Sequence, residues 1–289
     1  MNHEEIAIIT DSCADIPREF IEKYHIYVLP MQINYSGGRF RDGIDITAEE
    51  VYELQKKELL HSSTPSGEDI ESLFSMLEEN GIQKAIAIML GSGISGTINH
   101  VRLAADDSRV DCFLIDSLSA SIGCGASVMQ TALWREEGFD FDTLCQKAAK
   151  LCKSTKVFFT LNTLEYLAKG GRINKTTAVA GNMLNIKPML SFDSVTGEIY
   201  VPLKIRGTKL LETKMIELIA GYTKESHSEN RPYNLMVADG GNVEEGNHLQ
   251  EKLTEAFPNA KQVFRAQIGA TLGVYLGPKL LGVGIQFLD

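Results

Sequence analysis

The 289-residue sequence predicts an α/β protein in two parts: a parallel sheet with helices on both faces, then a mixed α+β region. Over residues 1–154, short apolar runs alternate with amphipathic segments of helical period, which is typical of a covered parallel sheet. After residue 155, two β-like runs flank a polar, glycine-containing stretch at 193–198, which predicts an antiparallel hairpin. We therefore expect an N-terminal α/β domain at residues 1–154 and a C-terminal α/β domain at residues 155–289.

The first part is expected to alternate strands and helices. The expected strands are residues 6–10, 26–35, 84–90 and 110–115. The expected helices are residues 17–24, 47–60, 66–81, 97–107, 120–137 and 141–154. Two of these helices carry start signals, because Thr47 with Glu50 forms a capping box and Ser66 with Asp69 resembles one.

The second part has a different pattern. The expected strands are residues 157–161, 186–192, 199–205, 234–238, 263–266 and a last strand that ends at Phe287. The expected helices are residues 164–169, 174–184, 209–224 and 244–257. Gly170 and Gly171 are expected to end the first of these helices. Residues 269–284 are spaced by glycines, and no element is assigned to most of them.

Composition and charge exclude several classes of protein. A hydrophobic content of 44% and a charged content of 23% are ordinary for a soluble globular protein. The net charge of −10 argues against a nucleic-acid partner, because a phosphate backbone selects clustered Lys and Arg. No apolar run has the length of a membrane span, and Met1–Glu5 lacks the basic start of a signal peptide.

The cysteines and histidines point to a reducing compartment and to no metal site. The five cysteines form no C-x-x-C pair, and an odd number suits a reducing environment. The six histidines are scattered, with none at metal-ligand spacing. We expect a cytoplasmic protein with no metal and no cofactor.

A glycine- and serine-rich turn, Gly91–Thr97, follows the strand at 84–90 and opens a helix. Glycines there would allow positive φ and close approach of a ligand, and the helix start offers unpaired N–H groups to an anion. Two other strands of this part also end in polar residues, Asp11-Ser12 and Asp116-Ser117. We expect these ends to form one polar edge that binds a negatively charged ligand. A tight connection without a ligand is the alternative for this turn taken alone.

Several kinds of chemistry lack their residues. Gly91 and Gly96 have the spacing of a P-loop, but Thr97 and Ile98 stand where Lys and Ser/Thr are needed. No G-x-G-x-x-G follows a strand, which leaves dinucleotide binding without support. A serine hydrolase or acyltransferase that uses Ser95 remains an alternative, although no signature supplies its base. A sugar- or phosphate-binding regulator is a third possibility.

Five stretches resemble the DegV family, bacterial fatty-acid-binding proteins that work with a fatty-acid kinase. They span almost the whole chain and occur in the family's order and spacing: Ile8–Ser12, Ser62–Ser66, Ser92–Thr97, Asp116–Ser121, and Lys169–Ile173 followed by Leu184–Pro188. The resemblance implies two α/β domains, the second of which closes over a long-chain fatty acid that lies between them. It also implies a non-catalytic carrier that presents the carboxylate to the kinase, which makes an acyl phosphate for phospholipid synthesis.

The resemblance also implies a set of site residues. The carboxylate would be held by Ser62 and Ser95, within a ligand-binding set of Ser62, Ser63, Ser92, Gly93, Ser95, Gly96 and Tyr275. Two positions depart from the family pattern. Ser62 stands where the family has threonine, which keeps the hydroxyl, and Tyr275 stands where relatives have the histidine that touches the carboxylate. A phenol donates one hydrogen bond but brings no cation near neutral pH.

Two arginines, Arg172 and Arg206, match exposed family residues that contact the kinase. Gly207 stands where the family commonly has threonine, so the match at Arg206 is weaker. Without the resemblance, we interpret either arginine as a solvent-exposed charge or as a side chain that interacts with the C-terminus of a helix.

Overall fold

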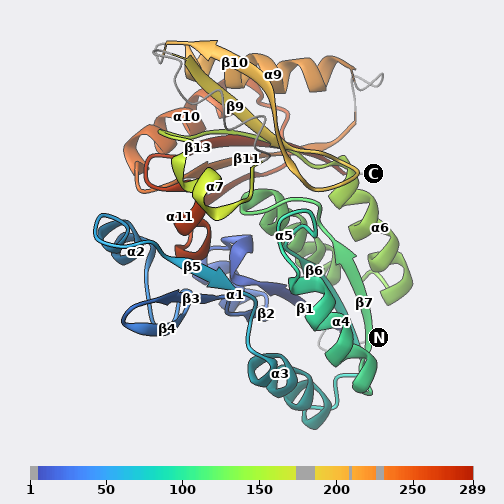
Figure 1. Cartoon of the computed structure of the whole chain (residues 1–289). Helices are drawn as coiled ribbons and strands as arrows, with labels where there is room; N and C mark the ends of the chain where they lie inside the picture. Colours follow the sequence, from blue (N-terminus) through green and yellow to red (C-terminus); the bar gives the residue numbers. More distant parts are fainter. Residues whose placement is uncertain (1–5, 174–185, 208–209, 226–230, 289) are drawn as a thin grey trace.

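The structure, a computed structural model, describes residues 6–173, 186–207, 210–225 and 231–288. Two large sheets dominate it, the six-stranded one at the top of Figure 1 and the four-stranded one at the lower right. A third sheet, small and three-stranded, lies at the lower left. The predicted fold class is confirmed: a parallel sheet with helices on both faces, followed by a mixed sheet.

The four-stranded sheet is parallel throughout, in the order β2-β1-β6-β7. Its strands are β1 (Ile6–Asp11), β2 (Ile26–Leu29), β6 (Lys84–Met89) and β7 (Asp111–Asp116). The core on one face contains α5 (Ile122–Glu136) and α6 (Phe141–Ser154), with α1 (Arg18–Lys23) beside them. The other face is covered by α3 (Gly67–Glu79) and α4 (Thr97–Asp107). The carboxyl ends of β1, β6 and β7 are neighbours, as predicted.

The three-stranded sheet is not predicted. The expected strand at 26–35 is broken at Pro30, and its second half is β3 (Gln32–Tyr35). A proline has no N–H to donate to a ladder, which favours a break there. The strand β3 pairs antiparallel with β4 (Gly38–Arg41) and with β5 (His61–Ser63), a segment expected to be a loop. The capping box of α2 (Ala48–Leu54) is present, but this helix ends earlier than the predicted residue 60.

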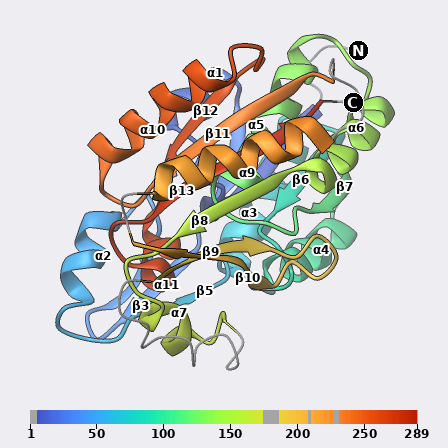
Figure 2. The ribbon, with the colours of Figure 1, turned by 90° about the horizontal axis from the view of Figure 1, so that it is seen from above.

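The six-stranded sheet is mixed, in the order β10-β9-β8-β13-β11-β12. Its strands are β8 (Lys156–Thr160), β9 (Ile186–Phe192), β10 (Ile199–Arg206), β11 (Tyr233–Asp239), β12 (Val263–Gln267) and β13 (Leu281–Phe287). The predicted hairpin is β9 with β10, which pair antiparallel. The helices α9 (Leu211–Glu225) and α10 (Val243–Ala256) cover the outer face, as Figures 1 and 2 show.

The inner face of this sheet turns toward the rest of the molecule. Side chains alternate along a strand, so Val157 and Phe159 of β8 point inward while Phe158 points toward α9. Two short helices lie on the inner side, α7 (Glu165–Gly170) and α11 (Ala270–Leu276). The helix α11 occupies the glycine-spaced segment to which no element was assigned. The helix predicted at 174–184 lies outside the described residues.

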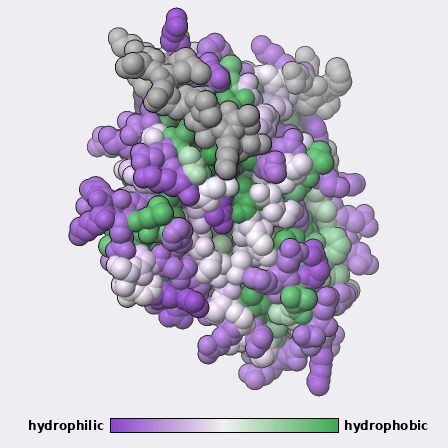
Figure 3. Space-filling view, viewed as in Figure 1, coloured by the Kyte–Doolittle hydropathy of each residue, from purple (hydrophilic) through white to green (hydrophobic). Residues whose placement is uncertain are grey.

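The division into domains at residue 154 remains a prediction. The chain passes from α6 to β8 there, but α5 packs against strands of both large sheets. Among the described helices, none combines the length and apolar character needed to cross a membrane. On the face drawn in Figure 3, hydrophilic side chains dominate the outline and apolar ones form separate small groups.

Candidate functional site

An apolar cavity of about 70 Å³ lies between the two large sheets. One wall consists of turns at the carboxyl ends of the parallel strands together with the start of α5; we call it the turn wall. It comprises Cys13, Leu90, Ile94, Ser95, Ala120, Ser121 and Ile122. The opposite wall, the sheet wall, is the inner face of the six-stranded sheet. It comprises Val157, Phe159, Phe192, Ile199, Ala238, Leu280 and Gly282. The remaining boundary includes Met31, Ser62, Arg172 and residues of α11.

A pair of hydroxyl groups marks the polar end of the cavity. The Ser62 Oγ lies 2.8 Å from the Tyr275 hydroxyl, which also lies 3.4 Å from the Ser62 backbone nitrogen. Ser62 faces the cavity because β5 is a strand and its neighbours point to the opposite side. Ser63 is on that opposite side, where its hydroxyl accepts a hydrogen bond from Asn34 Nδ2.

Arg172 reaches the same end of the cavity from the loop after α7. Its guanidinium carbon lies 4.6 Å from the centre of the Tyr275 ring, and its Nη1 donates to the Gly170 carbonyl. Both glycines before it are needed. A Cβ at Gly170 would lie 2.3 Å from the Tyr275 ring, and Gly171 has φ +70°, which ends α7 in the left-handed region. The Lys169–Arg172 segment therefore places a cation against Tyr275.

Ser95 lines the cavity from the turn between β6 and α4. Its Oγ lies 2.8 Å from Thr97 Oγ1 and accepts a hydrogen bond from the Thr97 nitrogen. Gly96 is the residue before α4; it provides no side-chain cap, and the first turn of α4 has no acidic residue. The start of this helix thus keeps the positive character that favours an anion.

The predicted reason for the glycines of this turn is partly wrong. None of Gly91, Gly93 and Gly96 has a positive φ. Two of them permit close packing instead: a Cβ at Gly91 would lie 2.8 Å from the Ser119 nitrogen. A Cβ at Gly93 would lie 2.3 Å from the Thr196 carbonyl oxygen, in the β9–β10 loop.

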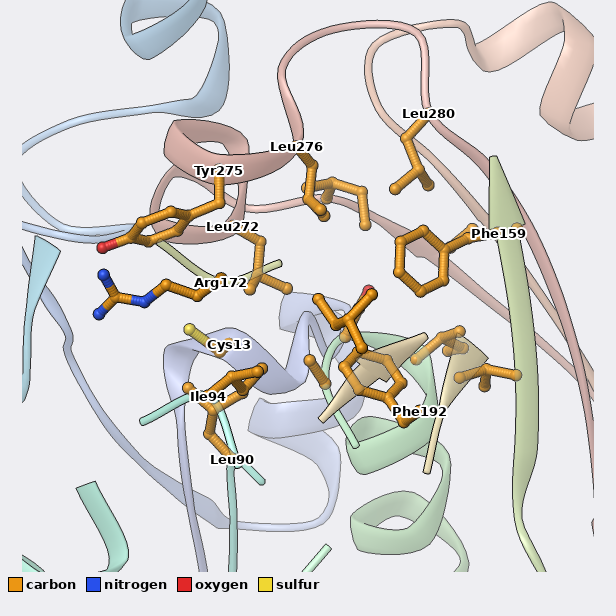
Figure 4. Close-up of a pocket in the computed structure, with 18 of the residues that line it drawn as sticks. Cys13, Leu90, Ile94, Phe159, Arg172, Phe192, Leu272, Tyr275, Leu276 and Leu280 are labelled. Atoms are coloured by element: carbon orange, nitrogen blue, oxygen red, sulfur yellow. The ribbon is translucent and has the colours of Figure 1, made fainter. Parts of the chain in front are cut away.

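The other end of the cavity is apolar. Figure 4 shows Tyr275 and Arg172 on one side and Phe159 and Leu280 on the other. The Phe159 and Phe192 rings pack together with centroids 5.6 Å apart. Among the described residues that line the cavity, Arg172 is the sole charged one.

Comparisons with known proteins identify the family of the chain. The profile described as an uncharacterised protein of the DegV family matches residues 5–288. The chain belongs to the DegV family. A DegV domain-containing protein of Clostridium acetobutylicum is 38% identical, over 97% of this chain and 98% of the relative. Protein DegV of Bacillus subtilis is 30% identical, over 96% of this chain and 98% of the relative.

Two solved structures have the same fold. DegV of Bacillus subtilis, described as a fatty acid binding protein, has a TM-score of 0.84 at 28% identity, over 98% of this chain and 99% of that one. A stearic acid-binding protein of Eubacterium ventriosum has a TM-score of 0.87 at 25% identity, over 98% of each chain.

This DegV family member places its predicted site residues in three groups. Ser62, Ser95, Tyr275 and Arg172 all line the cavity, and Tyr275 contacts both Ser62 and Arg172. Gly93 and Gly96 line an adjoining surface cleft of about 440 Å³, which shares Ser95 and Arg172 with the cavity. The structure does not bring the others to the cavity: Ser63, Ser92 and Arg206 are exposed, and their predicted roles stay predictions.

Three buried carboxyls lie behind the turn wall, and their arrangement is not predicted. Asp15 Oδ1 accepts a hydrogen bond from the Gly269 nitrogen, and the Asp42 carboxylate accepts hydrogen bonds from the nitrogens of Ala270 and Thr271. These two acids thus hold the start of α11, the helix that carries Tyr275. Asp11 accepts from the nitrogens of Cys13 and Leu90 and so joins β1 to the end of β6. Asp11 is thus the N-cap of the short helical turn that follows its strand.

Burial raises the pKa of all three carboxyls. Loss of water raises the pKa of Asp11 to about 6, although bonds from the Leu90 and Cys13 nitrogens oppose the rise. Desolvation likewise raises the pKa of Asp42 and, more strongly, that of Asp15. These groups are acceptors for backbone N–H groups, and within the described residues no cluster of His, Cys, Asp or Glu is arranged to hold a metal ion.

Nothing in the described part of the chain activates Ser95 as a nucleophile. Its hydroxyl pairs with Thr97, and none of the described residues that line the cavity is a histidine. His100, which lies on α4, has its Nδ1 at 2.9 Å from Thr64 Oγ1. The serine hydrolase alternative is therefore not supported, because a serine needs an adjacent base to react.

Proposed function

We propose that this protein binds one long-chain fatty acid in the cavity, with the carboxylate at the Ser62–Tyr275 end and the acyl chain running toward Phe159. The observation that carries this proposal is the lining itself, which is apolar over most of its length and has one cation, Arg172, at the polar end. Such a site fits an anion with a long hydrocarbon body.

The similar structures from Bacillus subtilis and Eubacterium ventriosum are described as a fatty acid binding protein and a stearic acid-binding protein, which supports the same ligand class. In the proposed complex, the hydroxyls of Ser62, Ser95 and Tyr275 donate to the carboxylate oxygens. Arg172 supplies the opposite charge from its position over the Tyr275 ring. Each hydrogen bond to a charged group is worth about 1.5–3 kcal/mol.

Most of the binding free energy comes from the chain. Burial contributes about 0.8 kcal/mol per methylene, so roughly fifteen methylenes contribute on the order of 12 kcal/mol before the costs of association. The free space of about 70 Å³ is small beside the ~300–1,000 Å³ of typical ligand pockets. Binding of the whole chain therefore requires the cavity to widen.

The adjoining cleft suggests how the bound acid would be used. It shares Ser95 and Arg172 with the cavity and is lined by Gly93, Gly96 and Glu198 among others. In the proposed carrier role, a cytoplasmic fatty-acid kinase approaches through this cleft and phosphorylates the carboxylate. Arg172 and Arg206 are the proposed contacts for the kinase, and the acyl phosphate would enter phospholipid synthesis.

Organic extraction of the purified protein followed by mass spectrometry tests the ligand. We expect C14–C18 acids at close to one per chain, and extracts without any such acid across several expression hosts would contradict the proposal. The carrier role is tested separately, by adding the loaded protein to a bacterial fatty-acid kinase with ATP and trapping acyl phosphate with hydroxylamine. Formation of the hydroxamate only when both proteins are present is the expected result.

A further inference from the structure

Glycine occupies two positions in the middle of the six-stranded sheet. Gly282 and Gly284 lie on β13, which pairs with β11 on one side and with β8 on the other without a shift in register. Neither glycine has a positive φ. Glycine inside a strand weakens it, and where there is no bulge or bend it often marks the close approach of another group. The surroundings of the two glycines show which group approaches each of them.

The packing of the sheet explains Gly284. A Cβ at this position would lie 2.8 Å from the Lys156 carbonyl oxygen, 2.8 Å from Met236 Cε and 2.9 Å from Val157 Cγ1. Met236 and Val157 are its cross-strand neighbours, and their side chains already occupy the space above the glycine. A larger residue would displace both side chains and press against the β8 backbone, so the protein itself requires glycine here.

Packing does not require glycine at position 282. The atoms nearest to a Cβ at Gly282 would be Phe159 Cβ at 3.3 Å and the Phe158 carbonyl oxygen at 3.5 Å. A shift of a few tenths of an ångström would relieve the closer of these contacts. Gly282 also lines the cavity, whereas Gly284 is not among the described residues that do. The sheet could therefore hold a larger residue at position 282, and its absence leaves free space on the cavity side.

The small residues continue on the neighbouring strand. Ala238 of β11 is the cross-strand partner of Gly282 and also lines the cavity. On the other side, Gly282 pairs with Phe159, and Phe159 pairs with Leu190 of β9. This row on the inner face thus changes from large side chains on β9 and β8 to small ones on β13 and β11. We call the place formed by Gly282 and Ala238 the sheet depression.

The position of the sheet depression indicates what fills it. Protein interiors are close-packed, and space that no group fills loses the contacts its walls would otherwise make. The depression lies beside Phe159 and Leu280, on the side of the cavity away from Tyr275 (Figure 4). Its surroundings are apolar, so the group that fills it is apolar too. In a ligand whose polar end lies at Ser62 and Tyr275, that group is the far end of a chain.

Resting on the fatty-acid site proposed above, we infer that Gly282 and Ala238 are specificity-determining residues: the sheet depression receives the last carbons of the acyl chain and sets the longest chain that binds with full affinity. Each methylene up to that length should strengthen binding about four-fold, and further ones should not. Acids too short to reach the depression should be insensitive to both residues, because their carboxylate is held at the opposite end.

Binding measured as a function of chain length tests this inference. Delipidated protein is titrated with saturated acids from C8 to C20 by displacement of a fluorescent acid, and the length at which affinity stops rising is determined. In Gly282→Val this limit should move to a shorter chain. The longest acid that the wild type binds with full affinity should bind about ten-fold weaker, whereas the shortest acids should stay within about two-fold.

Two further variants make the result specific. Ala238→Val narrows the same depression from the neighbouring strand and should move the limit in the same direction, so the inference does not depend on the folding of one variant. Ala266 of β12 is the matched control, because it follows Ala238 in the same row and is buried but is not among the described residues that line the cavity. Ala266→Val should leave the limit unchanged, even where it lowers the unfolding temperature.

The outcomes separate this inference from the proposed function. If the wild-type protein binds long acids and the two depression variants weaken all chain lengths equally, or none, the inference is overturned and the fatty-acid site stands. A limit that moves as far in Ala266→Val would also overturn it. Failure of both depression variants to fold would show that packing requires these small residues, with the same consequence. If no acid binds the wild-type protein, both proposals fail.

Discussion

The two walls of the cavity are built in different ways. The sheet wall is one face of regular strands, and side-chain alternation gives it an unbroken apolar surface. The turn wall consists of connections at strand ends, and it carries two hydroxyls, Ser95 and Ser121, among apolar side chains. In the proposed complex, the sheet wall would contact the acyl chain, whereas Ser95 of the turn wall would help Ser62 and Tyr275 to orient the carboxylate.

The largest effect should follow from a charge on the sheet wall. We expect Phe192→Asp to weaken binding of palmitate on the order of 1,000-fold, about 4 kcal/mol, because an unpaired carboxylate would face the chain. Tyr200→Asp, on the exposed side of the neighbouring strand, should change affinity little. Calorimetric titration measures both, and equal losses would show that the sheet wall does not contact the ligand.

Removal of hydroxyls at the polar end should have the next largest effect. Ser62→Ala combined with Ser95→Ala should weaken binding on the order of 100-fold, because the carboxylate loses two charge-assisted hydrogen bonds. The matched pair Ser63→Ala with Ser92→Ala has hydroxyls outside the cavity and should stay within about two-fold of the wild type. The reverse order of effects would refute the assignment of Ser62 and Ser95. Fluorescent-acid displacement is a suitable measurement.

Removal of the single hydroxyl of Tyr275 should weaken fatty-acid binding less than the double serine variant does. Tyr275→Phe keeps the ring under Arg172 and loses one donor, so we expect about ten-fold weaker binding. Tyr275→His restores the family residue and should make affinity rise as pH falls through about 6.5, since the imidazole gains its charge there. Affinity measured from pH 5.5 to 8 would contradict this if the histidine variant followed the wild-type curve.

The smallest expected effect is a pH dependence of stability that arises from Asp11, one of the buried carboxyls behind the turn wall. The pKa of Asp11 is raised to about 6 by burial, whereas the unfolded chain releases this proton near pH 4. The folded state therefore holds more protons between these values, and stability falls as pH rises through that window. Between pH 7.5 and 5, Asp11 should increase the free energy of unfolding on the order of 1 kcal/mol. The difference in this increase between the wild type and Asp11→Asn, measured by urea titration at each pH, isolates its contribution.

Two substitutions sharpen this test. Asp11→Asn should reduce the pH dependence, because one of the three carboxyls whose pKa is raised by burial is gone. Asp140 is an exposed cap of α6 whose pKa is lowered by hydrogen bonds from Thr143, so Asp140→Asn should leave the dependence between pH 5 and 7.5 unchanged. Stability that decreases as the pH is lowered in this range would contradict the role of Asp11.

Helices and strands whose bounds depend on nearby residues were predicted correctly. The bounds of α4, α6 and β9 agree with the expected ranges, because apolar period, caps and turn residues all act within a few positions. The strand β5 and the helix α11 were missed. A three-residue strand exists only through its pairing with β3, and the glycines of 269–284 weaken a helical pattern.

The candidate site was predicted in part for the same reason. Ser62 and Tyr275 are 213 positions apart, and no periodicity connects them; the family resemblance was the sole signal that put both on one ligand. The contacts of Asp15 and Asp42 with the start of α11 span more than 200 positions and carry no motif. The glycines of the turn were noticed correctly, but the packing that requires them became visible only in three dimensions.

Gly93 lies backbone to backbone with the loop that joins β9 and β10, about 100 positions later in the chain. Any larger residue there would lift that loop, and through it the edge of the six-stranded sheet. A saturation mutagenesis screen would consequently score this glycine as indispensable because of packing, whereas a side chain at Gly96, which has open space around it, would not disturb that contact.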